Sequence, residues 1–145
     1  MNNKNLTTKG NLVLEKSNST NNPRIAVYIR NACYSPESYE KQKKLLIGYC
    51  KRYFRNSVVD IYEDVNCSGL SNLSERDGFR NLINKIEFNE YDILLVKDIN
   101  RISRNMDSIC DFVTFAIDNG VLIHTLNGQT RWLADDEGRV VIFYG

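Results

Sequence analysis

Two short runs of uninterrupted apolar residues constrain the fold of this chain more than any other feature. The runs cover residues 25–29 and 93–96. A strand that is exposed on one face alternates apolar and polar residues, so a continuous run is typical of a strand covered on both faces. Strands of that kind belong to parallel sheets, whose connections are helical crossovers. The runs therefore predict an α/β fold.

The segments between and after these runs have the apolar spacing of amphipathic helices. Helices are predicted over residues 36–54, 79–86 and 109–117, and further strands over residues 58–62 and 121–126. Ser35 suits the N-cap of the first helix, Pro36 its first position, and Gly120 the end of the last helix. This alternation predicts a three-layer architecture, with a mostly parallel sheet, helices on both faces and right-handed crossovers.

The two ends of the chain differ from this pattern. Residues 1–23 are rich in Asn, Thr, Ser and Lys, and this composition predicts a disordered tail before a single domain over residues 24–145. Near the C-terminus, an Asn-Gly turn predicts a short antiparallel edge strand over residues 130–133. The apolar run 140–144 follows the acidic segment 135–139. It fits either a last core element or the first turns of a helix, and we favour the helix.

The net charge and the cysteines limit the classes of function that this chain can have. The net charge is +1 over 145 residues, so binding of nucleic acid would depend on locally focused arginines. The four cysteines form no CxxC pair and the single histidine is His124, which argues against a zinc site. No apolar run has the length of a membrane span, and no secretory signal is visible. We therefore expect a cytoplasmic protein with free thiols, no metal and no membrane partner.

Polar side chains follow the ends of the first three predicted strands. The candidates are Arg30, Asp64, Ser68, Arg76, Arg101 and Arg104. Arg101 and Arg104 are three residues apart, so one helical turn would place both on one face. Guanidinium groups that converge can donate in pairs to phosphate oxygens and can stabilise the charge of a phosphoryl-transfer transition state. The alternative is that these arginines are merely solvated at the surface.

Five short motifs follow one another along the chain. They are Tyr28-x-Arg30, Gln42, Asp64-x-x-x-Ser68-Gly69, Arg76-Asp77-Gly78-Phe79 and Arg101-Ile102-Ser103-Arg104-Asn105. In this order they resemble the catalytic domain of the serine recombinases, the resolvase and invertase family, over about residues 24–145. The resemblance implies a resolvase-like fold and DNA cleavage by a serine that attacks a phosphate. That attack gives a 5′-phosphoserine and a free 3′ hydroxyl, and strands are then exchanged within a tetramer without a cofactor.

The resemblance also implies roles for the polar residues at the strand ends. Arg30, Arg101 and Arg104 would contact the scissile phosphate. Arg76 would support them, and Asp64 would orient an arginine or the surroundings of the nucleophile. One departure from the family pattern lies at Asn100, where many small resolvases carry an aspartate.

The nucleophilic serine of that family would stand at Ala32, two residues after the arginine that ends the first strand. Alanine has no lone pair, so covalent catalysis at this position is excluded. Cys33, Ser35 and Ser38 are the nearby alternatives, although Ser35 has a structural role as N-cap and Cys33 is displaced by one residue. The sequence does not decide whether Ala32 is natural or engineered.

Three functions are compatible with these observations. The first is a serine-recombinase-type domain for DNA cleavage and strand exchange, impaired at Ala32. The second is a non-catalytic accessory or regulatory subunit for DNA recombination. In both cases DNA is the partner, and the chain forms a homodimer, a tetramer or a hetero-oligomer with an active recombinase, to which the C-terminal helix would contribute. The third is an unrelated α/β domain for a small molecule or nucleotide, but no P-loop or GxGxxG turn supports it.

Overall fold

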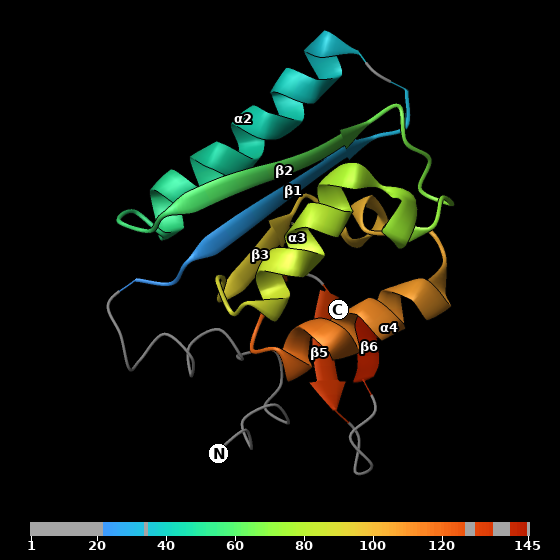
Figure 1. Cartoon of the computed structure of the whole chain (residues 1–145). Coiled ribbons are helices and arrows are strands. Elements are labelled where there is room, and N and C mark those ends of the chain that lie inside the picture. The colour runs from blue at the N-terminus through green and yellow to red at the C-terminus, as the bar shows by residue number, and fades with distance from the viewer. Residues whose placement is uncertain (1–21, 34, 127–129, 135–139, 145) are drawn as a thin grey trace.

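A four-stranded parallel sheet forms the centre of the molecule (Figure 1). The computed structural model describes residues 22–33, 35–126, 130–134 and 140–144. In the sheet order β2-β1-β3-β4, the strands are β2 (Val59–Val65), β1 (Ile25–Asn31), β3 (Ile93–Val96) and β4 (Leu122–Thr125). All three neighbouring pairs are parallel, as the apolar runs predict.

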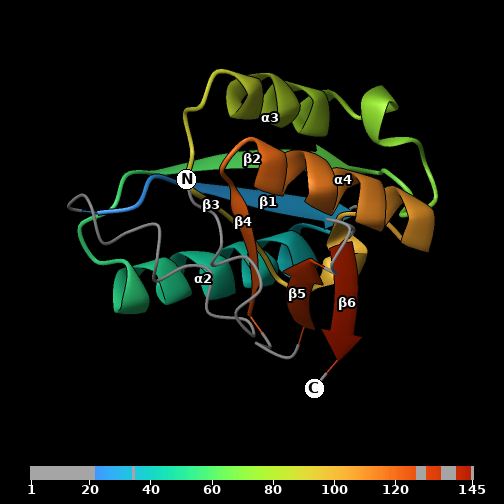
Figure 2. The ribbon, with the colours of Figure 1, turned by 90° about the horizontal axis from the view of Figure 1, so that it is seen from below.

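Helices cover both faces of this sheet, which confirms the three-layer prediction. They are α2 (Pro36–Tyr53), α3 (Asp77–Glu87) and α4 (Met106–Asp118), with two 3₁₀ turns, η2 (Leu73–Glu75) and η3 (Ile99–Arg101). Helix α2 packs on one face, and α3 and α4 pack on the other (Figure 2). Among the described residues, no helix is both long and apolar enough to cross a bilayer.

The first strand supplies both halves of the core because successive side chains point to opposite faces. Val27 and Ile29 pack with Leu46 of α2. Tyr28 packs with Phe79 of α3 on the other side, where the two rings meet edge to face at 5.0 Å. The strand is buried along its whole length, so it fixes the position of the polar residues that follow it.

The helix ends form as the local sequence predicts. Ser38 donates its backbone N–H to the Ser35 side chain at 3.3 Å, with Pro36 in the first turn. Gly120 has a φ of 80°, and its N–H bonds the Ile117 carbonyl at 2.9 Å beyond the end of α4. Glycine adopts this left-handed conformation without steric cost, so the chain can turn directly into β4.

The prediction of a helix over residues 140–144 is wrong. Val140–Tyr144 forms β6, which pairs antiparallel with β5 (Thr130–Ala134) in a separate two-stranded sheet. All five residues of β6 are β-branched or aromatic, and these types favour strands over helices. The strand predicted at 130–133 is present, but it pairs with β6 in the separate sheet and is not an edge strand of the parallel sheet. The acidic segment 135–139 and the predicted tail over residues 1–21 lie outside the described residues.

His124 of β4 gives the fold a predicted pH dependence. Its Nε2 lies 2.6 Å from the Tyr49 hydroxyl of α2, and burial lowers the pKa of the imidazole. As the pH falls, the imidazole of the unfolded chain is therefore protonated before that of the folded chain, near its ordinary pKa of about 6.5. Above that pH the neutral ring contributes its full stability, and the free energy of unfolding should decrease as the pH falls below about 6.5.

Urea unfolding of the wild type and of His124→Gln, at about pH 7.5 and about pH 5.5, checks this expectation. The variant should lose less stability between the two pH values than the wild type. An equal loss in the two proteins would show that other groups cause the pH dependence.

Candidate functional site

Four arginines from three separate segments gather at the carboxyl edge of the sheet. They are Arg30, Arg76, Arg101 and Arg104, here called the arginine cluster. The pKa of Arg30 is lowered by burial and then by the positive charges of the other three. A Cβ on Gly69 would lie 2.8 Å from the Arg104 Cγ and 2.9 Å from the Arg30 Nη2, so these two side chains cover the same glycine. The structure thus brings together the arginines that the sequence singled out.

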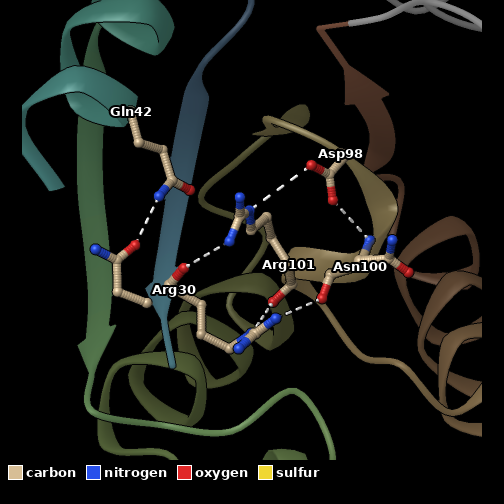
Figure 3. A network of polar contacts seen from close by, with 6 residues as sticks. Arg30, Gln42, Asp98, Asn100 and Arg101 are labelled. Atoms are coloured by element: carbon tan, nitrogen blue, oxygen red, sulfur yellow. Dashed lines mark hydrogen bonds and ion pairs between the residues drawn. The ribbon is translucent and has the colours of Figure 1, made fainter. Parts of the chain in front are cut away.

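Arg30 is buried and holds two loops against the end of β1, and Figure 3 shows its bonds to the loop of Asn100 and Arg101. Its side chain donates from Nε to the Arg101 carbonyl at 3.0 Å, from Nη1 to the Cys67 carbonyl at 2.9 Å and from Nη2 to the Asn100 carbonyl at 2.8 Å. Within the described residues its partners are carbonyl groups and not carboxylates. Its positive charge therefore stays unneutralised in a site of low solvent access, where an anion is attracted strongly.

Arg76 anchors the loop between β2 and η2. It is 1% exposed and donates from Nη1 to the Ile102 carbonyl at 2.6 Å and from Nε to the Ser71 hydroxyl at 3.0 Å. Its Nη2 also lies within 3.3 Å of the Gly69 and Ser71 carbonyls. The arginine thus positions the loop that carries the neighbouring site residues.

Arg101 and Arg104 are the accessible members of the cluster. Arg101 ends η3 and donates from Nη1 to the Arg30 carbonyl at 3.3 Å, and its Nε lies 3.7 Å from an oxygen of Asp98. Arg104 is exposed. The expected helical turn through both residues is absent, because the Asn105 side chain caps α4 directly after Arg104. The loop form places the two cations at the mouth of the cluster instead of along a helix face.

The Asp64 carboxylate bonds the start of α3 and Tyr28 of β1. Its carboxylate accepts from the Gly78 N–H at 2.8 Å, from the Phe79 N–H at 2.9 Å and from the Tyr28 hydroxyl at 2.8 Å. No arginine bonds it among the described residues. The carboxylate caps the start of α3. Burial, together with the hydrogen bond to Asp64, raises the pKa of the Tyr28 hydroxyl. A Cβ on Gly78 would clash with the Glu63 carbonyl, so glycine allows this close approach.

Ala32 lies just beyond β1, exposed, at the same edge as the cluster. The Cys67 N–H donates to the Asn31 carbonyl at 3.0 Å, so the loop of the second strand runs beside this position. Ser68 is also exposed, and its hydroxyl accepts from the Leu70 N–H at 3.0 Å. Cys33 is exposed, whereas the Ser35 hydroxyl caps α2 as predicted. The methyl of Ala32 can neither attack a phosphate nor bind one.

Asn31 is a buried site neighbour that the sequence reasoning missed. Gln42 of α2 donates to the Asn31 side-chain oxygen at 2.8 Å (Figure 3). Asn31 Nδ2 and Gln42 Oε1 have no partner among the described residues. A polar residue at the end of a continuous apolar strand was the signal that could have identified Asn31. The described residues contain no group of three or more histidine, cysteine or acidic side chains that could hold a metal ion.

Comparisons with known proteins agree with this geometry. The family model described as the resolvase N-terminal domain matches residues 25–144. The N-terminal catalytic domain of TP901-1 integrase is 28% identical, with 74% of this chain and 80% of that chain covered and a TM-score of 0.63. No curated protein sequence matches significantly.

Two more distant structures share the fold. The C-terminal catalytic domain of ISC1926 TnpA, an IS607-like serine recombinase, is 24% identical, with 71% of this chain and 69% of that chain covered and a TM-score of 0.60. A resolvase family site-specific recombinase from Streptococcus pneumoniae is 21% identical, with 72% and 73% covered and a TM-score of 0.56.

Proposed function

This chain belongs to the resolvase family of serine recombinases, and we propose that its arginine cluster binds a phosphodiester group of DNA. The observation that carries the proposal is that the four arginines of the cluster differ in burial and in contacts. Arg30 and Arg76 are buried and fix the loops, while Arg101 and Arg104 stand at the accessible mouth. Four positive charges against one paired carboxylate, Asp98 at 3.7 Å from Arg101, favour a bound anion, and paired guanidinium donors fit a phosphate.

The chemistry of this site depends on the residue at position 32. A serine there could form a bond from its oxygen to the phosphorus while the bond to the 3′ oxygen breaks and that oxygen takes a proton. Ala32 has no such oxygen, so the chain holds the phosphate without cleaving it. Arg101 and Arg104 would be placed to stabilise the charge of the phosphoryl-transfer transition state. Position 32 supplies no nucleophile that could start this reaction.

A second proposal is that the chain is an accessory subunit of DNA recombination. It is favoured by the contrast between the absent nucleophile and the intact bonds that hold Arg30 and Arg76. A domain of this kind could occupy a DNA site and associate with copies of itself or with an active recombinase. It would then control strand exchange through oligomerisation and not through cleavage.

Substitution of Arg104 tests the binding proposal. Arg104→Gln should weaken binding to a labelled DNA duplex about 10-fold, the effect of losing one charge-assisted hydrogen bond of about 1.4 kcal/mol. It should also reduce the slope of log affinity against log salt concentration by about 0.9. Fluorescence anisotropy over a series of salt concentrations measures both quantities.

Arg80→Gln is the matched control, because Arg80 is an exposed arginine of α3 whose side chain bonds Asp77 and the Ser74 carbonyl and not the other arginines. This variant removes the same charge and should retain nearly all of the affinity. If the two variants weaken binding equally, the arginine cluster is not the DNA-binding site.

A further inference from the structure

The outward face of α2 and the turn that follows the helix carry a concentration of positive charge that the site does not use. Residues 41–55 contain six basic residues and no acidic residue, although the net charge of the whole chain is +1. Five of them are exposed, namely Lys41, Lys44, Lys51, Arg52 and Arg55, and they are called the basic stripe below. The stripe lies opposite the buried face of α2. A helix with such one-sided charge is a typical electrostatic footprint for nucleic acid.

Ion pairs within the described part of the chain do not explain these charges. None of the ion pairs among the described residues includes a member of the basic stripe. Glu37 and Glu40 stand four residues before Lys41 and Lys44 on α2 and offset part of the repulsion between these two lysines. Lys51 and Arg52, in the last turn of α2, and Arg55, just after the helix, have no acidic residue within four positions. A solvated helix face usually mixes both signs of charge, which avoids this cost. A bound polyanion would remove the repulsion.

Gly48, at the centre of the basic stripe, gives evidence that does not depend on the charges. It is exposed in the interior of α2, and a Cβ at this position would meet nothing within 4 Å. Packing within the chain therefore does not require a glycine, although glycine in a helix interior is less favourable than alanine. The missing side chain leaves a flat gap between Lys44 and Lys51. Such a gap lets a sugar-phosphate backbone approach the helix closely.

We propose that the basic stripe of α2 binds duplex DNA through its phosphates, independently of sequence and in addition to the arginine cluster. The inference rests on the proposed function, because DNA is the polyanion that the cluster would already hold. The first turns of α2 adjoin the site through the Gln42–Asn31 hydrogen bond, and the helix then runs back along the sheet (Figure 1). At 1.5 Å per residue its length is about 27 Å, enough to follow several phosphates.

Paired charge variants test the stripe. Lys44→Gln/Lys51→Gln should weaken duplex binding by the whole chain and reduce the salt-dependence slope by about 1 to 2. The control Arg80→Gln/Lys85→Gln removes two exposed charges from α3 and should leave the slope nearly unchanged. Equal effects of the two double variants would overturn the inference.

Gly48 provides a test that does not change the charge. Gly48→Leu should raise thermal stability, because leucine favours helices, and yet weaken duplex binding several-fold by filling the gap. Gly48→Ala should be more stable than the wild type and retain most of the affinity. If Gly48→Leu binds as tightly as the wild type, no backbone approaches the helix at this point.

The outcomes separate this inference from the proposed function. If Arg104→Gln weakens binding and both stripe variants behave like their controls, the stripe inference fails alone. If the wild type does not bind a DNA duplex even at low salt, the proposed function fails as well. If the stripe double variant loses affinity for polyglutamate but binds the duplex as tightly as the wild type, the stripe takes acidic protein and the DNA assignment is wrong.

Discussion

Replacing Ala32 with serine is expected to produce a covalent protein–DNA adduct that the wild-type chain does not form. The new hydroxyl would stand at the carboxyl edge of the sheet, beside the arginine cluster and the Cys67 loop. Its oxygen would bond to phosphorus, and the 3′ oxygen would leave with a proton. Loss of the nucleophilic serine costs on the order of 10⁶-fold in rate in a serine protease, and a similar factor here would leave no detectable adduct without the hydroxyl.

The measurement fuses each protein to a DNA-binding domain of known site and looks for adducts that survive denaturing electrophoresis. Ala32→Ser/Arg101→Gln is the control, since it restores the hydroxyl but removes a cation from the mouth of the cluster, and it should form far less adduct. An adduct from the unmodified chain would contradict the proposal and point to Cys33, Ser35 or Ser38. If Ala32→Ser binds DNA without forming an adduct, Ala32 is not the sole defect, and Asn100 is the next position to change.

Substituting the buried Arg76 should have the largest effect on stability. Arg76→Met leaves the carbonyls of Ile102 and Ser71 and the Ser71 hydroxyl without their donor. Hydrogen bonds to charged groups contribute about 1.5–3 kcal/mol each, and orphaned buried acceptors add their own penalty. We expect the free energy of unfolding to fall by about 4 kcal/mol, a large part of the stability of a domain of this size.

Urea denaturation measures this loss, and Arg80→Met serves as the reference. Arg80 pairs with Asp77 at 2.6 Å on the exposed side of α3, and exposed pairs of this kind contribute about 0.5 kcal/mol. A similar small loss for the two variants would mean that the bonds of Arg76 do not hold the loop. A large loss for Arg76→Met alone would establish it as a positioning residue for the cluster.

Much of the architecture could be predicted because its signals are local. The uninterrupted apolar runs identify β1 and β3, since covered parallel strands tolerate few polar residues. Ser35 and Gly120 mark helix ends through the hydrogen-bonding and conformational properties of single residues. The run 140–144 was mistaken for a helix because an apolar run of five residues has no period, and its pairing with β5 is a tertiary contact.

The site was less predictable than the fold for the same reason. Asp64 could be placed at the end of its strand, but its bonds to α3 involve residues 14 and 15 positions away. Its role as a cap depends on how the helix packs, and the resemblance implied only that Asp64 orients an arginine or the surroundings of the nucleophile. Asn31 was not predicted as a site residue, because its burial depends on α2 lying over the end of β1.

By itself the sequence determined the order of strands and helices, the arginines that follow the strand ends and the absence of an attacking oxygen at Ala32. These properties depend on residue types and on spacing along the chain. The tertiary structure alone decided that Arg30 is buried against carbonyls about seventy residues away while Arg104 stays exposed. Hydrogen-bond partners that are distant in sequence meet only when the sheet and its loops have assembled, and that assembly separates the cations that hold the site from those that can reach a ligand.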